Sequence, residues 1–159
     1  METKIKDILI LGIGNDILTD DGIGPKFVNE LQKTNSFPEA DFLTAAVGGL
    51  EILEMIRDYN KVIIIDAIRT RDGIPGTVYH LTPTDFKETL HVSSFHDITF
   101  LAALELGERL KIKIPSQINI IAIEIVEDLV FSNDFSPELQ NKIPDIYKEV
   151  KDSIKEYLK

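Results

Sequence analysis

Cysteine is absent from this 159-residue chain, and no apolar run approaches the roughly 20 residues that a membrane-spanning helix needs. Without cysteine the chain can form neither a disulfide framework nor a thiolate metal site, and a Cys–His nucleophile is excluded. Any metal must therefore be bound by His, Asp or Glu. The N-terminal stretch METKIKDILILG leads directly into an apolar run without a secretory cleavage site, so we expect a cytoplasmic protein that does not associate with membranes.

Positive charge is also scarce, with 17 Lys and Arg against 27 Asp and Glu. The resulting net charge of −10 and isoelectric point near 4.7 would repel a phosphate backbone, so nucleic acid is not an expected partner. A hydrophobic fraction of 43% and a charged fraction of 28% are typical of an ordinary globular protein. The length predicts one domain that buries roughly two thirds of its unfolded surface.

Strand-like and helix-like patterns alternate along the first half of the chain. The apolar runs at 6–12 and 61–66 are typical of central strands covered on both faces, and a weaker strand is predicted at 41–46. Helical spacing of apolar residues occurs at 24–31, after Pro25, and at 50–59. Because helices connect the strands, the sequence predicts an α/β fold with a mostly parallel sheet and helices on both faces.

The second half continues this alternation. A turn-rich segment precedes a strand at 77–81, and the short connection favours antiparallel pairing with the preceding strand at a sheet edge. A helix at 98–110 is apolar around most of its circumference, which predicts deep burial, and a strand follows at 118–125. The last helix is expected to begin at Ser136, with Pro137 in its first turn and a kink at Pro144.

Residues 10–24 read I-L-G-I-G-N-D-I-L-T-D-D-G-I-G, an apolar strand that ends in two glycines and is followed by two acids. The third glycine of a dinucleotide-binding G-x-G-x-x-G would fall at Ile17, so Gly12 and Gly14 more simply permit a tight turn. Phosphate or nucleotide binding at this turn remains an alternative.

Three polar residues are predicted to converge at the carboxyl edge of the sheet, where ligands bind in open α/β folds. Asp21 follows the first strand, Asp66 ends the V-I-I-I-D strand, and His96 precedes the helix at 98–110. Two carboxylates and an imidazole suit a divalent first-row metal. Taken singly, Asp21 could be a helix cap, Asp66 a turn residue and His96 a solvated histidine.

Other polar residues have simpler interpretations. Asp20 is expected to cap the first helix, and His80 and His91 are expected at the surface. The templates H-E-x-x-H and G-x-S-x-G are missing, so standard hydrolase arrangements fail. A serine nucleophile stays open at Ser93, Ser94, Ser116, Ser132, Ser136 and Ser153.

Four segments, in order along nearly the whole chain, resemble the hydrogenase maturation proteases, endopeptidases that trim the C-terminus of the [NiFe]-hydrogenase large subunit. They are ILGIGNDILTDDGIG, VIIIDA before IPGTVYHL, SSFHDI before an apolar helix, and IEI with FSPEL before the last helix. The resemblance implies a single domain over residues 1–159 with a twisted, mostly parallel five-stranded sheet between helices. A departure from the family's usual Gly-Thr pair occurs at Ala46-Val47 and puts a polar role at position 47 in doubt.

The resemblance also implies a ligand set and a mechanism. By motif match the metal-binding and catalytic positions are Asp21, Asp66 and His96. The metal would be nickel supplied by the precursor of the hydrogenase large subunit, which is the expected protein partner, and zinc or cadmium could act as surrogates. A monomer is expected. A nickel-binding assembly factor without peptidase activity is the main alternative, and a nucleotide- or phosphate-binding domain is a weaker one.

Overall fold

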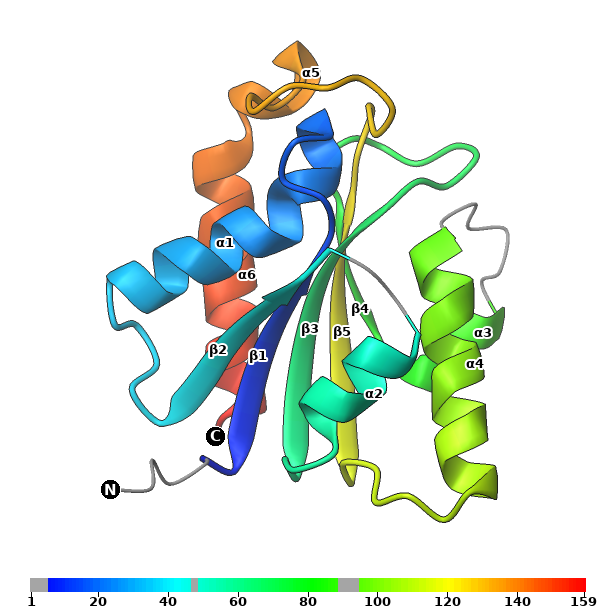
Figure 1. Ribbon diagram of the computed structural model, residues 1–159. Helices are drawn as coiled ribbons and strands as arrows, with labels where there is room; N and C mark the ends of the chain where they lie inside the picture. Colours follow the sequence, from blue (N-terminus) through cyan, green and yellow to red (C-terminus); the bar gives the residue numbers. More distant parts are fainter. Residues whose placement is uncertain (1–5, 47–48, 89–94) are drawn as a thin grey trace.

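The computed structural model describes residues 6–46, 49–88 and 95–159, with side chains described for all of these except 86–88 and 95–99. Its centre is a five-stranded sheet in the order β2-β1-β3-β5-β4 (Figure 1). The first four strands in this order are parallel, and β4 runs antiparallel to β5 at the edge. The strands are β1 (Ile8–Ile13), β2 (Ala40–Ala45), β3 (Lys61–Ile68), β4 (Val78–Leu81) and β5 (Gln117–Glu124).

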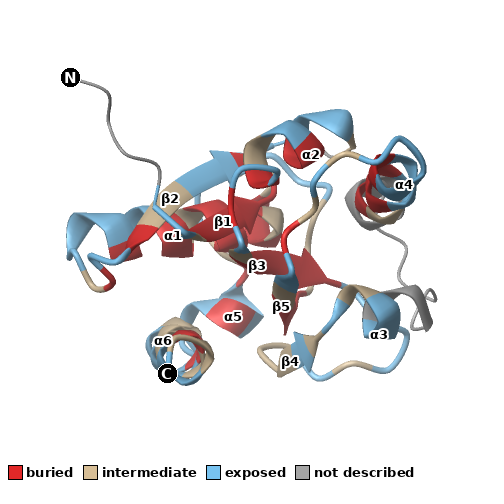
Figure 2. Ribbon diagram, turned by 90° about the horizontal axis from the view of Figure 1, so that it is seen from below, coloured by how far each residue is buried: buried red, intermediate tan, exposed pale blue. Residues whose placement is uncertain are grey.

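Helices cover both faces of this sheet (Figures 1 and 2). Helices α1 and α6 pack on one face, whereas α2 and α4 pack on the other. This arrangement confirms the predicted α/β class with a mostly parallel sheet. The helices are the 3-10 turn η1 (Thr19–Gly22), α1 (Ile23–Lys33), α2 (Leu50–Ile56), α3 (Pro83–Glu88), α4 (Phe95–Arg109), α5 (Pro137–Gln140) and α6 (Ile143–Tyr157).

Strand β3 explains why its sequence is apolar without interruption. Ile63 and Ile65 contribute to the core under α1 and α6, whereas Val62 and Ile64 contribute to the core under α2 and α4. Successive side chains of a strand point to opposite faces, so a strand covered on both sides must be apolar at every position. The polar residue Asp66 interrupts this run two residues before the strand ends at the carboxyl edge of the sheet.

The predicted pairing of the edge strand is wrong. Strand β4 lies at the edge as expected, but it pairs with β5, with Tyr79 opposite Ala122, and not with the preceding strand β3. Both β3 and β5 are buried over most of their length and need a neighbour on each side. The half-buried β4 tolerates the edge, so β5 is inserted between β3 and β4.

Two helix predictions also need correction. In the described side chains of α4, Phe100 and Leu104 are buried but Leu106 is 39% exposed, so α4 buries one side instead of its whole circumference. The last helix is two helices, α5 and α6. Pro144 does not kink a continuous helix, because it lies in the first turn of α6, where its missing N–H has no helical partner to lose.

None of the helices in the described part of the chain is long and apolar enough to span a membrane.

Candidate functional site

Asp21 and Asp66 lie on elements that meet at the carboxyl edge of the sheet. Strands β1 and β3 are parallel neighbours, with Gly12 opposite Ile65, so both end at the same edge. Turn η1, which contains Asp21, contacts β3. The start of α1 also lies close to β3, because a Cβ placed on Gly24 would be 2.4 Å from the Ile65 carbonyl oxygen.

Two glycines allow this close approach. Gly14 has a φ of +145°, and a Cβ on it would lie 2.0 Å from the Asp21 carbonyl oxygen. A Cβ on Gly12 would lie 2.5 Å from the Gly24 carbonyl oxygen. Both contacts are shorter than any real side chain can make, so only glycine fits. The tight-turn interpretation of the Gly-x-Gly pair thus agrees with the packing of η1 against the end of β1.

Asp21 is half-buried and orients the loop between β1 and η1. Its Oδ2 accepts a hydrogen bond of 2.8 Å from the Asn15 backbone N–H. It does not cap α1, whose N-cap residue is Gly22. A phosphate bound at this turn would have to compete with the Asp21 carboxylate for the Asn15 N–H and would be repelled by the charge of that carboxylate. The local geometry therefore disfavours the phosphate-binding alternative.

Asp66 is a buried carboxylate near the end of the apolar strand β3. It is only 5% exposed, and its Oδ1 accepts a hydrogen bond of 2.8 Å from the Ala67 N–H. By alternation it shares a face with Ile64 and Ile68, which pack under α2 and α4. Asp66 therefore lies on the sheet face that α4 covers.

His96 is the second residue of α4, but its side chain lies outside the described part of the chain, as does the whole of His91. Helix α4 ends at Arg109 and is followed by the start of β5 at Gln117, so its first turn points toward the carboxyl edge of the sheet (Figure 1). Among the side chains that are described, no three His, Asp or Glu residues are grouped to hold a metal ion. The predicted site of Asp21, Asp66 and His96 stays a prediction.

Asp20, the neighbour of Asp21, has a role that the sequence did not indicate. It is fully buried, and its carboxylate accepts hydrogen bonds from the backbone N–H groups of Val126, Glu127 and Ser136 and from the Ser136 hydroxyl. The prediction that Asp20 caps the first helix is therefore wrong, because Gly22 is the N-cap residue of α1. Asp20 instead fixes η1 to the loop that follows β5, more than 100 residues later in the chain.

Glu124, at the end of β5, is a second buried carboxylate that sequence analysis missed. It is 1% exposed and accepts hydrogen bonds from the N–H and hydroxyl of Thr70, and from the Tyr79 hydroxyl at 3.3 Å. The bonds to Thr70 fix the loop that leaves β3 after Ile68. The only signal in the sequence is the acid that ends the apolar run 118–123, the same pattern that identified Asp66.

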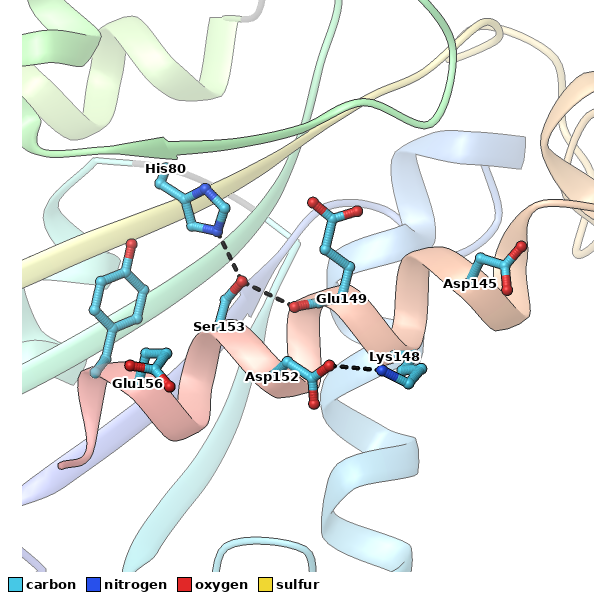
Figure 3. Close-up of a pocket in the computed structure, with 8 residues that line it drawn as sticks. His80, Asp145, Lys148, Glu149, Asp152, Ser153 and Glu156 are labelled. Carbon is cyan, nitrogen blue, oxygen red and sulfur yellow. Dashed lines mark hydrogen bonds and ion pairs between the residues drawn. The ribbon is translucent and has the colours of Figure 1, made fainter.

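A cavity of about 740 Å³ lies between β4 and α6, on the opposite face from Asp66 (Figure 3). His80 Nε2 is 2.7 Å from Ser153 Oγ, a distance compatible with a serine nucleophile and its base. However, Ser153 Oγ donates its single proton to the Glu149 carbonyl oxygen at 2.8 Å. His80 must then donate to Ser153, so this pair connects β4 to α6 and does not activate the serine. His80 is exposed, as expected.

The fold and the site together define an α/β protein with two carboxylates, Asp21 and Asp66, at the carboxyl edge of a mostly parallel sheet. A sequence model of the hydrogenase maturation proteases matches residues 25–153. The chain belongs to the hydrogenase maturation protease family.

Individual relatives support this assignment. The chain is 36% identical over 72 residues to hydrogenase 2 maturation protease of Escherichia coli, which is 45% of this chain and 44% of that protein. It is 39% identical over 77 residues to a putative hydrogenase maturation protease of Methanocaldococcus jannaschii, covering 47% of this chain and 49% of that protein. The matched segments thus span about half the length of these two relatives.

The fold extends the likeness over nearly the whole chain. The structure of the hydrogenase maturating endopeptidase HybD from E. coli is similar with a TM-score of 0.75 and 25% identity, over 94% of this chain and 93% of that one. The [NiFe] hydrogenase maturation protease HybD from Thermococcus kodakarensis is similar with a TM-score of 0.66 and 25% identity, over 91% and 97%. The single-domain α/β fold is therefore that of the HybD-like proteases.

Proposed function

We propose that this protein is an endopeptidase that removes the C-terminal extension from a nickel-loaded precursor of a [NiFe]-hydrogenase large subunit. The observation that carries the proposal is the family match over residues 25–153, together with the likeness to HybD over 94% of the chain. The two carboxylates at the carboxyl edge of the sheet add a chemical reason, because they lie where α/β proteins bind their ligands.

In this proposal Asp21, Asp66 and His96 are both the metal ligands and the catalytic residues. They contact nickel that is already bound in the precursor, so the metal belongs to the substrate. Asp66 supports this role because its carboxylate lies on the sheet face that α4 covers, near the carboxyl edge where α/β proteins bind ligands. Asp21 supports it because the Asn15 N–H holds its carboxylate in one orientation.

The chemistry follows from positioning. A metal ion can polarise the scissile carbonyl or lower the pKa of a bound water molecule. In either route the three side chains bind the metal from one side and hold the neighbouring peptide bond close to it. The reaction then becomes effectively unimolecular. Recognition of nickel would also restrict cleavage to precursors in which the metal has been inserted.

The test is a processing assay with nickel-loaded precursor and the variants Asp66→Ala and His96→Ala, scored by loss of the C-terminal extension. We expect wild-type protein to cleave, and both variants to lose about 100-fold or more of the rate while keeping the circular dichroism spectrum of the wild type. His80→Ala is the matched control, because His80 lies on the opposite face, and it should cleave at the wild-type rate. Normal processing by Asp66→Ala or His96→Ala would remove that residue from the site.

The same assay separates the protease from a non-catalytic nickel-binding assembly factor, which would bind the loaded precursor and leave its extension in place. We further propose that the protein works as a monomer in the cytoplasm. Light scattering of the purified protein and fractionation of cells test these two statements.

A further inference from the structure

The loop that follows β5 exposes three consecutive large apolar side chains. Leu129 is 78% exposed, Val130 is 54% exposed and Phe131 is 76% exposed. Ile17, on the loop that follows β1, is 47% exposed. Single exposed apolar residues are common on protein surfaces, but such a group is typical of a surface that binds another molecule. We call these four residues the apolar ledge.

The backbone that carries the ledge is fixed. Ser132 N–H donates to the Ile17 carbonyl at 2.9 Å, and Thr19 N–H donates to the Ser132 carbonyl at 3.1 Å. The Thr19 hydroxyl donates to the Val130 carbonyl at 2.5 Å. Because these bonds already order the loop, docking of a partner on the ledge requires little further loss of conformational entropy.

The ledge adjoins the candidate site. The loops that meet in it leave the carboxyl ends of β1 and β5, the two strands that flank β3 with its Asp66. Thr19, which holds the Val130 carbonyl, is two residues from Asp21 in the same 3-10 turn. A polypeptide that presents a peptide bond to Asp21 and Asp66 would therefore pass close to the ledge.

A cavity of about 460 Å³ lies beside the ledge, and its lining indicates the charge that a bound partner should carry. Val130 and Phe135 contribute apolar walls, and the acidic residues Glu127, Asp134 and Glu138 also line it. The Lys26 ammonium, 4.6 Å from the Phe135 ring centroid, offsets part of this negative charge. An acidic cavity that adjoins an apolar surface favours a segment with apolar residues and a neighbouring cationic side chain.

We propose that the apolar ledge binds an apolar segment of the precursor polypeptide next to its cleavage site, with a cationic side chain of that segment in the acidic cavity. This proposal rests on the proposed function, since it assigns a docking surface for the same substrate. The ledge then contributes to substrate affinity, whereas Asp21, Asp66 and His96 contribute to the chemical step.

The test compares kcat and KM for nickel-loaded precursor between the wild type and the double variant Leu129→Ser/Phe131→Ser. We expect KM to rise about tenfold or more with kcat within about twofold, because two apolar contacts made equally in the ground state and the transition state are lost. Leu110→Ser is the matched control: Leu110 is 61% exposed just after α4, at the other end of the sheet, and its KM should not change.

Other outcomes overturn the proposal. An unchanged KM in the double variant, with wild-type protein cleaving normally, rejects the ledge and leaves the proposed function intact. Should wild-type protein not cleave at all, the proposed function fails. The ledge is then tested by the dissociation constants for the same precursor: a higher value in the double variant than in the wild type supports it, and equal values reject it. A wild type that dimerises in light scattering, with a monomeric double variant, would assign the ledge to a second copy of this chain.

Discussion

Asp20 and Ser136 are joined by two hydrogen bonds of 2.7 Å, from the Ser136 N–H and the Ser136 hydroxyl to the two carboxylate oxygens of Asp20. Both residues are buried, and they lie 116 positions apart in the sequence. Since Asp20 also receives the N–H groups of Val126 and Glu127, this one carboxylate joins the turn of Asp21 to the loop of the apolar ledge.

Removing this carboxylate should destabilise the protein. Asp20→Ala leaves three backbone N–H groups and one hydroxyl without their acceptor, so we expect the free energy of unfolding to fall by about 3 kcal/mol or more in urea denaturation. Ser136→Ala removes one hydrogen bond and should cost about 1–2 kcal/mol. Asp134→Ala, an exposed acid in the same loop, is the control and should change stability by less than about 0.5 kcal/mol. A stable Asp20→Ala variant would contradict the assigned role of Asp20.

Gly14 should tolerate no side chain. Gly14→Ala puts a Cβ 2.0 Å from the Asp21 carbonyl oxygen, at a position whose φ is +145°. We therefore expect the free energy of unfolding to fall by about 2 kcal/mol or more. Processing should also be slower, because the turn that carries Asp21 must move. Gly107→Ala is the control: its Cβ would meet only flexible side-chain ends of Leu53 and Ile114 at 3.2 and 3.3 Å, and stability should change by less than about 1 kcal/mol. Thermal melts and the processing assay measure both effects.

Tyr59 should make the free energy of unfolding fall as the pH becomes alkaline. Burial raises the pKa of Tyr59 to about 12, assisted by its hydrogen bond of 2.9 Å to Asp41. Because the folded state holds this proton more tightly than the unfolded state, the stabilisation is complete below pH 10 and is lost as the pH rises from 10 to 12. We expect Tyr59→Phe to be less stable at pH 8 and to show a shallower loss of stability from pH 10 to 12. Equal slopes for both proteins would contradict this assignment.

The sequence predicts those features that depend on local pattern. The uninterrupted apolar run of β3 and the acid that ends it identified a covered central strand and Asp66, because a strand buried on both faces cannot hide polar residues. The glycines at 12 and 14 indicated a tight turn for the same local reason.

Features that depend on distant partners were not predictable in this way. Asp20 looks like a helix cap in sequence, and only the fold brings the loop of Ser136 to it. The neighbour of β4 is decided by which strand most needs a neighbour on each side, a property of the whole sheet. Pro144 lies in the first turn of α6 because the helix that begins at Pro137 ends at Gln140, which periodicity alone does not reveal.

The central claim is that the protein acts on nickel carried by its substrate, and one measurement tests it most directly. Wild-type protein is incubated with nickel-loaded precursor and with the same precursor free of metal, and release of the C-terminal extension is followed in both. The account predicts cleavage of the loaded precursor and no cleavage, above background, of the metal-free one. Cleavage of both precursors at the same rate would contradict it.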